Sequence, residues 1–194
     1  MKNSSFVEIC DYVNEKGVRS VSFDIDGTIY PILKIQLRWW KAFLLNPVRA
    51  LRFYRIKKTW EGRRKGDRGI EASPDDVTFF EDFLTGMMDE SLVPIDVLDW
   101  ITELGAREVQ VYFLSDHGAM AKLKRLGLAH MGKPINCLTE TGELKPHGKI
   151  SELLRDKYGI DPKTHLHLGD RWTDEEQAKL FGCEFRYFRP EELF

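Results

Sequence analysis

Short apolar runs alternate with amphipathic stretches along most of the chain and divide it into predicted strands and helices. The apolar runs predict strands at 18–24, 109–114, 135–139, 164–168 and 184–188. Apolar residues three and four positions apart predict helices at 4–16, 94–104, 118–126, 147–158 and 173–181. Because strands and helices alternate, we expect an α/β fold in which a parallel sheet carries helices on both faces.

One long segment interrupts this alternation, because it has helical patterns and no predicted strand. The helical patterns cover 34–45, 47–60 and 74–89. Ser73 precedes the last pattern as an N-cap, and Pro74 takes the first helical position, where no amide hydrogen is needed. The sequence therefore predicts an α/β core made of residues 1–30 and 93–194, and a helical insertion made of residues 31–92.

The first predicted strand ends in two carboxylates, Asp24 and Asp26, and Gly27 follows them. Residues i and i+2 of a strand point to the same side, so both acids can converge on one site if the chain stays extended through Ile25. Open α/β sheets bind ligands at the carboxyl ends of their strands. The alternative is an Asp-Gly hairpin turn, but Pro31 lacks the amide donor that a partner strand would need.

The second predicted strand ends in Ser115, and the loop after it leads into a helix. Unpaired amide groups at such a helix start suit an anion, whereas an isolated serine is more often an ordinary N-cap. Asp116 and His117 share this loop, and we expect both to have structural or supporting roles. Ser115 therefore gains significance only from the residues that accompany it.

Two further polar clusters lie later in the chain. Lys145 precedes Pro146 and a predicted helix, where a fixed cation would neutralise phosphate oxygens; Lys149, one turn away, competes for this role. Asp170 follows the strand at 164–168, and Asp174 comes four residues later. If residues 170–174 form a helical turn, both acids lie on one face.

Taken in chain order, these clusters resemble the four sequence motifs of the haloacid dehalogenase superfamily of phosphohydrolases. The motifs read Asp-x-Asp-Gly-Thr, Ser, Lys-Pro and Gly-Asp-x-x-x-Asp, and they begin here at 24, 115, 145 and 169. Each motif alone is a weak signal, but four in the right order form a strong one. The resemblance covers 18–30 and 94–189 and implies a Rossmann-like core. It also implies that the insertion is a helical cap, which many members carry at this place.

The resemblance implies a phosphatase that hydrolyses a phosphate monoester through an aspartyl-phosphate intermediate. Asp24 would be the nucleophile. Asp26 would protonate the leaving alcohol and then activate water, and its presence separates phosphatases and mutases of this superfamily from the ATPases and dehalogenases. Ser115 and Lys145 would bind the phosphoryl group and offset its charge.

The cofactor implied by the resemblance is Mg²⁺, a hard ion that prefers oxygen ligands. Asp24, the main-chain carbonyl of Asp26, and Asp170 would hold the ion. Asp174 would complete the coordination or bind a metal-bound water. His165 and His167 would share a face of their strand, but no third ligand at suitable spacing supports a zinc site.

Two alternatives to a phosphatase remain open. A phosphomutase would use the same residues and would differ in excluding water. A non-catalytic scaffold would keep the fold and dock on a membrane or on nucleic acid through the insertion. The intact set of Asp24, Asp26 and Asp170 favours an enzyme.

Composition is typical of a soluble globular protein, with 194 residues, 42% hydrophobic and 31% charged. The cysteines are odd in number and widely spaced, which predicts neither a disulfide framework nor a zinc cluster. We expect a reduced cytoplasmic setting, because the first residues lack an apolar signal core and no stretch approaches the roughly 20 apolar residues of a membrane span.

Charge is distributed unevenly, because residues 31–69 carry twelve Lys or Arg and two acids, a net +10. Aromatic residues are interleaved with these cations. The cations are either solvated on cap helices whose aromatics pack internally, or they attract a polyanionic substrate, an anionic membrane surface or nucleic acid, of which nucleic acid is the least expected. A small phosphorylated substrate is the expected partner. If the cap closes over the site, some insertion cations would face that substrate: Arg38, Lys41, Arg49, Arg52 and Arg55.

Overall fold

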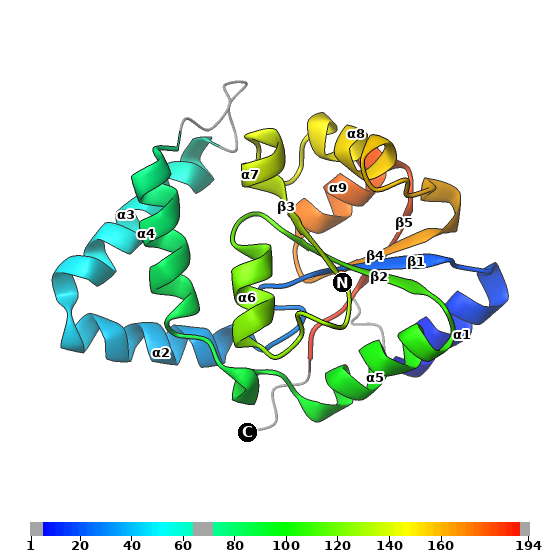
Figure 1. Cartoon of the computed structure of the whole chain (residues 1–194), viewed down its shortest axis with the longest axis horizontal. Coiled ribbons are helices and arrows are strands. Elements are labelled where there is room, and N and C mark those ends of the chain that lie inside the picture. The colour runs from blue at the N-terminus through cyan, green and yellow to red at the C-terminus, as the bar shows by residue number, and fades with distance from the viewer. Residues whose placement is uncertain (1–5, 64–71, 191–194) are drawn as a thin grey trace.

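The computed structural model describes residues 6–63 and 72–190, and a parallel sheet forms its centre (Figure 1). Within these residues the sheet has the strand order β3-β2-β1-β4-β5, and every neighbouring pair is parallel. The strands are β1 (Ser20–Asp24), β2 (Gln110–Ser115), β3 (Lys133–Asn136), β4 (His165–Gly169) and β5 (Glu184–Tyr187). The predicted α/β fold with a parallel sheet is confirmed.

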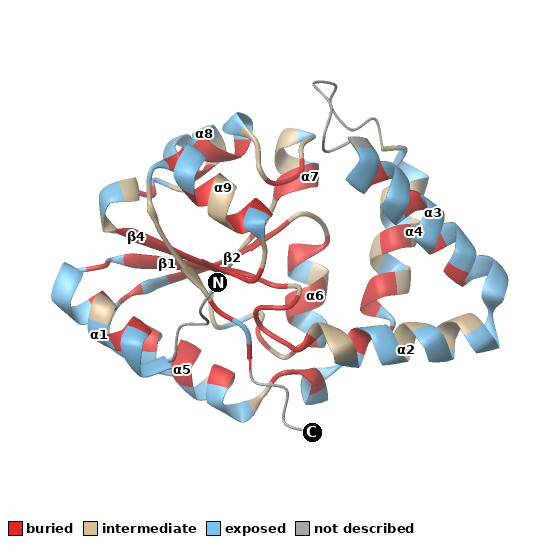
Figure 2. Ribbon diagram, turned by 180° about the vertical axis from the view of Figure 1, so that it is seen from behind, coloured by how far each residue is buried: buried red, intermediate tan, exposed pale blue. Residues whose placement is uncertain are grey.

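Both faces of the sheet are covered by helices, as Figures 1 and 2 show. On one face, Val21 and Phe23 pack in an apolar cluster with residues of α1 (Phe6–Lys16), α5 (Ile95–Ala106) and α6 (Ala119–Arg125). On the other face, Tyr112 and Leu114 pack with α8 (Gly148–Asp156) and α9 (Trp172–Phe181). Side chains alternate between faces along a strand, so each strand contributes to both layers. A short 3₁₀ helix, η2 (Pro162–Thr164), leads into β4.

One predicted strand is a strand in the structure for only part of its length. The strand expected at 135–139 ends at Asn136, and α7 (Cys137–Thr141) replaces its second half. The main-chain N–H of Asn136 donates to Glu140 Oε1 at 2.9 Å, which stabilises a helix start. The helix buries the apolar residues Cys137 and Leu138. A short apolar run of this kind fits a buried strand or a buried helix equally well, so the sequence pattern did not distinguish them.

The insertion consists of α2 (Ile32–Leu45), α3 (Pro47–Arg63), α4 (Pro74–Thr85) and the 3₁₀ helix η1 (Glu90–Leu92). Ser73 caps α4 as predicted, and its hydroxyl accepts from the main-chain N–H of Asp76 at 3.1 Å. The helix expected to reach residue 89 ends at Thr85, because Gly86 follows and Asp89 caps η1. The start of the first helix, predicted at residue 4, lies outside the described residues.

The insertion helices pack on one another and on the core. Helix α2 contacts α3, α3 contacts α4, and α4 contacts α6. Phe53, Trp60 and Phe80 belong to the same apolar cluster as Phe23 of the central strand. The insertion therefore shares buried apolar surface with the sheet. Among the described residues, no helix is both long and apolar enough to span a membrane.

Candidate active site

A cavity of about 510 Å³ lies between the insertion helices and the carboxyl ends of the central strands. Asp24 at the end of β1, and Asp26 and Asp116 in the loops after β1 and β2, line its core side, together with Lys145 and with Asp174 of α9. All these acids lie at the edge of the sheet where the parallel strands β1, β2 and β4 end. Such an edge is where open α/β sheets bind ligands.

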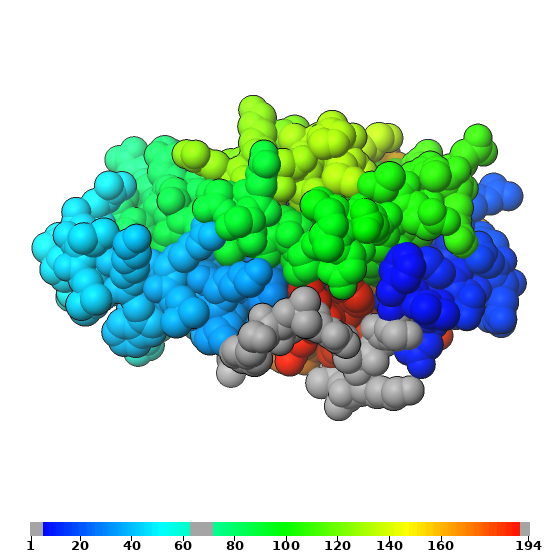
Figure 3. Space-filling view, turned by 90° about the horizontal axis from the view of Figure 1, so that it is seen from below, coloured from blue at the N-terminus to red at the C-terminus, as the bar shows by residue number. Residues whose placement is uncertain are grey.

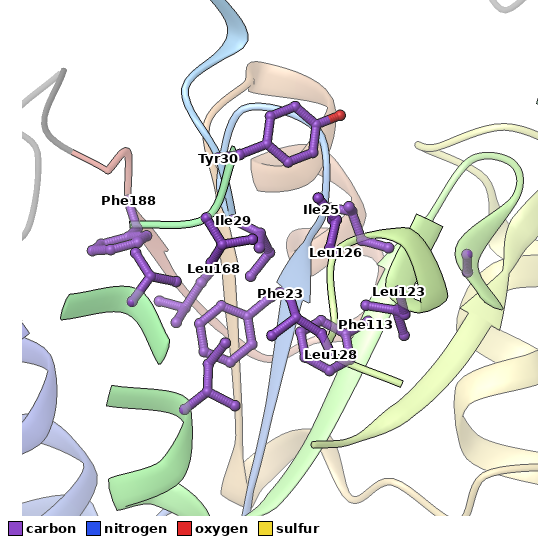
Figure 4. Close-up of a cluster of buried hydrophobic side chains, with 14 of the residues drawn as sticks. Phe23, Ile25, Ile29, Tyr30, Phe113, Leu123, Leu126, Leu128, Leu168 and Phe188 are labelled. Atoms are coloured by element: carbon purple, nitrogen blue, oxygen red, sulfur yellow. The ribbon is translucent and has the colours of Figure 1, made fainter. Parts of the chain in front are cut away.

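The loop after β1 turns away from the sheet at once. The main-chain N–H of Ile29 donates to the Ile25 carbonyl at 3.1 Å, and β1 pairs in parallel with β2 and β4, so the hairpin alternative is wrong. Ile25 and Ile29 are fully buried and anchor the loop in the apolar cluster of Figure 4. Gly27 has φ +93°, and a Cβ there would lie 2.6 Å from Asp170 Oδ2. Glycine thus brings the loop directly against the acid of β4.

Lys145 lies between two of the predicted acids. Its Nζ donates to Asp24 Oδ1 and to Asp174 Oδ1, both at 2.6 Å, and its main-chain N–H donates to Asp116 Oδ1 at 2.8 Å. Burial raises the pKa of Asp24 to about 8, and the Lys145 ammonium opposes that rise. Lys149 is exposed and pairs with Glu143 at 3.1 Å. Lys145 is therefore the lysine of this motif that lies at the site.

Asp26 is held by two donors that the sequence analysis did not identify, Tyr30 and Lys122. The Tyr30 hydroxyl donates to Asp26 Oδ1, and Figure 4 shows this side chain above the apolar cluster with its hydroxyl pointing away. Lys122 on α6 is fully buried, donates to Asp26 Oδ2, and lies 2.9 Å from Ser115 Oγ. Burial alone would raise the pKa of Asp26, but the Lys122 charge lowers it below its ordinary value.

Ser115 lies at the end of β2 as predicted, beside Lys122. Its hydroxyl donates to the His117 carbonyl at 3.0 Å and accepts from the Lys122 ammonium. The ring of His117 packs against the insertion, with ring centroids 4.5 Å from Phe80 and 5.8 Å from Trp60. This loop thus connects the candidate site to the insertion.

Asp170 and Asp174 converge, but not through the helical turn expected at 170–174. Arg171 is extended, and α9 begins at Trp172. Asp174 is instead a capping residue of α9, and its Oδ2 accepts from the Arg171 main-chain N–H at 3.2 Å. Burial would raise the pKa of Asp174, yet Lys145 lowers it, whereas burial raises the pKa of Asp170.

Three carboxylates form a set that fits a hard cation. Ligand atoms of Asp24, Asp170 and Asp174 lie within 4.8 Å of one another, and all three residues are buried. Asp170 Oδ1 is buried and accepts no hydrogen bond from the described residues; the Arg171 Nε lies 3.5 Å away. A buried carboxylate oxygen without a hydrogen bond suits a metal ion that prefers oxygen ligands, such as Mg²⁺. The carboxylate of Asp26 lies outside this set and pairs with Lys122.

The two strand histidines belong to a buried polar chain and not to a zinc site. Ser20 Oγ lies 2.7 Å from His165 Nδ1, and Ser22 Oγ lies 2.8 Å from His165 Nε2 and 2.7 Å from His167 Nδ1. Burial lowers the pKa of His165 to about 3 and also lowers that of His167. His167 Nε2 faces Asp174 Oδ1 at 3.7 Å. Burial thus favours the neutral form of both imidazoles, and His167 is the one that lies beside Asp174.

Residues 18–182 match the family model described as a haloacid dehalogenase-like hydrolase. The chain belongs to this family. Solved structures with the same fold include L-2-haloacid dehalogenase from Xanthobacter autotrophicus, at 18% identity and a TM-score of 0.62, with 87% of this chain and 76% of that chain covered. A predicted phosphoglycolate phosphatase from Haemophilus somnus 129pt has 19% identity and a TM-score of 0.57, and 88% of each chain is covered.

A third solved structure with the same fold is CbbY from Rhodobacter sphaeroides in complex with phosphate. It has 14% identity and a TM-score of 0.62, with 90% of this chain and 87% of that chain covered. At these identities the likeness shows the fold alone. No match was found among curated proteins.

Sequence reasoning missed Lys122, although a signal was present. Ala119, Lys122 and Leu123 share the buried face of α6, so a lysine occupies an apolar position of an amphipathic helix. A lysine buried in this way needs a carboxylate partner. The insertion cations were predicted less well, because the cations of the insertion that line the cavity are Lys57 and Lys58. The cations expected to face the substrate do not line it: Arg38, Lys41, Arg49, Arg52 and Arg55.

Proposed function

We propose that this hydrolase is a phosphatase that cleaves a phosphate monoester through an aspartyl-phosphate on Asp24. The Asp24 carboxylate attacks phosphorus, the bond from phosphorus to the ester oxygen breaks, and the alcohol leaves with a proton from Asp26. Water, losing its proton to Asp26, then attacks the phosphoenzyme, which releases inorganic phosphate and regenerates Asp24. A small phosphorylated substrate is the proposed partner.

The observation that carries this proposal is the presence of Asp26 beside Asp24 in one cavity. Tyr30 and Lys122 both donate hydrogen bonds to the Asp26 carboxylate. A halide leaving group needs no proton, so a dehalogenase gains nothing from an acid at this position. The oxygen of an alcohol is a poor leaving group unless it is protonated. The presence of Asp26, a carboxyl group that can donate a proton, therefore supports ester cleavage over dehalogenation.

Lys122 gives Asp26 two protonation states that suit the two steps. With Lys122 paired to it, Asp26 is a carboxylate, which is the form that accepts a proton from water. A phosphate dianion beside Ser115 would compete for the same ammonium, because Lys122 Nζ lies 2.9 Å from Ser115 Oγ. Weakening of the Lys122 pair raises the pKa of Asp26 and favours the protonated form that the leaving alcohol needs.

Asp24, Asp170 and Asp174 would hold Mg²⁺, with the main-chain carbonyl of Asp26 as a further ligand. When bound, the ion neutralises charge on the phosphoryl oxygens and on the attacking carboxylate. Lys145 already contacts two of these acids and would stabilise the phosphoryl group from the opposite side. Residues 31–92 would act as the cap that keeps bulk water from the site.

The test is hydrolysis of p-nitrophenyl phosphate by purified protein with Mg²⁺. We expect turnover that EDTA abolishes and Mg²⁺ restores, and no turnover by Asp24→Asn at an unchanged melting temperature. Acid quench with ³²P-labelled substrate should trap label on the wild-type protein and none on the variant. Full turnover by Asp24→Asn would overturn the proposal, and transfer of the label within a sugar phosphate without release would indicate a mutase.

A further inference from the structure

The walls of the cavity change chemistry from its core end to its insertion end. At the core end the lining is charged, with Asp24, Lys145 and Arg171. At the insertion end the lining is dominated by aliphatic and aromatic side chains: Ile35, Trp39, Phe53, Trp60, Leu84 and Met87. A phosphate group bound at the charged end therefore extends the rest of its ester into a hydrocarbon environment.

This apolar wall is held in place by its own packing. The rings of Phe53 and Phe80 stack with centroids 4.4 Å apart, and Trp60 packs on Phe80 at 4.8 Å. Phe53, Trp60 and Phe80 are all buried. Because these side chains are already ordered, binding of an apolar ligand group against them loses little side-chain conformational entropy.

The apolar end provides few partners for a polyhydroxylated body. The polar side chains that reach the cavity from α2 and α3 are Gln36, Tyr54, Lys57, Lys58 and Glu61, and all five are exposed. Sugar hydroxyls placed against the aromatic wall would lose water without gaining hydrogen bonds, which disfavours them. The volume of about 510 Å³ matches that of pockets for small organic ligands.

Resting on the proposed function, we infer that the substrate is a phosphate monoester of an alcohol with an extended apolar body. The phosphate lies against Asp24 and Lys145, and an alkyl or aryl group fills the apolar end of the cavity, where Trp39 is part of the wall. Each methylene that leaves water should raise kcat/KM about three- to fourfold until the cavity is full. The result is a preference set by chain length and not by hydroxyl pattern.

The experiment compares kcat/KM for ethyl, butyl, hexyl and octyl phosphate and for glucose 6-phosphate, with wild type and Trp39→Ala. We expect a stepwise rise with chain length, a low value for the sugar phosphate, and a loss of at least tenfold by Trp39→Ala for octyl phosphate only. Ile95→Ala removes an exposed apolar side chain outside the cavity and serves as control.

Equal kcat/KM across the alkyl series, or a preference for the sugar phosphate, would overturn this inference and leave the phosphatase intact. Absence of hydrolysis and of Asp24-dependent label with every ester would overturn the phosphatase itself. Trp39→Phe keeps an aromatic wall, so it should retain the chain-length preference. If Trp39→Ala lowers activity on all esters equally, the side chain is structural and the inference is wrong.

A second, independent feature is an exposed apolar corner where α2 meets α3. The corner lies at the end of the molecule away from α1 (Figures 1 and 3), and Figure 2 shows α3 largely exposed and α2 exposed or half-buried along most of its length. Leu44, Leu45 and Val48 at the turn are 80%, 77% and 76% exposed, and Leu37 and Trp40, which also reaches the rim of the cavity, continue the surface along α2. We call these five side chains the apolar corner. Contiguous apolar surface of this kind marks an interaction site.

Cations accompany the apolar corner without acids. The segment 31–60 contains eight Lys or Arg and no Asp or Glu. Arg38 and Arg52 pair with acids outside the segment. Lys41, Arg49 and Arg55 are exposed and form no ion pair in the part of the chain that the structure describes.

The geometry points to an anionic lipid bilayer as the surface on which the apolar corner docks. Leucine, valine and tryptophan side chains would enter the interface, while neighbouring cations would meet anionic headgroups. A second copy fits poorly, because two such corners would bring Lys41 and Arg49 against each other with no acid between them. Nucleic acid would leave the apolar side chains of Leu44 and Leu45 without a role.

The test is co-sedimentation of the full chain with vesicles of pure phosphatidylcholine and of phosphatidylcholine with 30% phosphatidylglycerol. We expect binding to the anionic vesicles only, weakened by salt. Lys41→Glu should lower the partition coefficient at least fivefold, because one basic residue near the surface contributes about that factor. The double variant Leu44→Asp/Leu45→Asp should abolish binding, and Leu180→Asp on α9, also exposed, should leave it unchanged.

No binding to anionic vesicles, or binding that ignores both substitutions, would overturn the docking proposal. Light scattering tests the alternative, that the apolar corner is a contact between two copies of the chain. A dimer of the wild-type chain that Leu44→Asp/Leu45→Asp converts to monomer would assign the apolar corner to self-association instead. Circular dichroism spectra identical to wild type would show that the exposed substitutions leave the fold intact.

Discussion

The ion pair between Lys122 and Asp26 should make a large contribution to the free energy of unfolding. Replacing Lys122 with methionine keeps the volume of the side chain but removes the charge that faces Asp26. The lysine is fully buried and the Asp26 side chain is 21% exposed. Removing one partner of a buried pair typically destabilises a protein by about 3 to 5 kcal/mol. Because Asp26 is partly exposed and keeps its Tyr30 donor, we expect about 3 kcal/mol at pH 8.

The pH dependence of this loss has a defined sign. In wild type the pKa of Asp26 is lowered, so the pair stabilises the fold above the unfolded pKa of about 3.9 and loses that contribution as pH falls through the lowered value. In Lys122→Met burial dominates and raises the pKa, so the variant loses stability as pH rises above about 3.9. The difference should therefore shrink from pH 8 to pH 4, by about 1.4 kcal/mol for each unit of rise in pKa.

Urea unfolding at pH 4, 6 and 8 measures this difference. Lys124→Met is the matched control, because Lys124 is exposed on the same helix. The double variant Lys122→Met/Asp26→Asn has no charge at either position and should show no such pH dependence. The reasoning fails if Lys122→Met destabilises no more than Lys124→Met, or if its penalty grows toward pH 4.

Further outcomes follow from the site. Gly27→Ala should lower the free energy of unfolding by about 1 to 3 kcal/mol, because φ is +93° and the new Cβ would meet Asp170; urea unfolding checks this, and Gly17→Ala, also at positive φ but in open space, separates strain from the clash. Mg²⁺ should raise the melting temperature of wild type and much less that of Asp170→Asn; an equal rise in both would exclude Asp170 as a ligand. Asp26→Asn should slow turnover of alkyl phosphates more than of p-nitrophenyl phosphate, whose leaving group needs little proton transfer; equal slowing in stopped-flow assays would remove its role as acid.

The strand-end residues were predictable because local patterns determine them. A parallel sheet brings the carboxyl ends of its strands to one edge, so Asp24, Ser115 and Asp170 had to lie close together once the strands were identified. Lys145 was separable from Lys149 by its proline neighbour, and the structure buries only the former. These conclusions needed strand order and direction but no knowledge of side-chain packing.

The insertion could not be predicted to the same depth. Which cations face the cavity depends on how each helix is rotated, and the inward face of α3 is set by Phe53, Ile56 and Trp60. Lys57 follows Ile56 and reaches the cavity, whereas Arg52 points to Asp76 on α4. Helix rotation is a property of tertiary packing, so charge counted along the sequence could not assign it.

Charge at the candidate site connects the proposed metal with the proposed substrate. Five carboxylates, Asp24, Asp26, Asp116, Asp170 and Asp174, meet four cations, Lys122, Lys145, Arg171 and Arg189. With every group counted as ionised, the carboxylates exceed the cations by one before a phosphate dianion arrives. A divalent cation removes that excess, and an apolar ester body adds no further charge to a cavity that already holds many. At the insertion end Lys57 lies 3.9 Å from Glu61 and is partly neutralised, whereas Lys58 is exposed at the cavity. The apolar wall, more than these exposed cations, therefore carries the proposed preference for a phosphate ester with an uncharged body.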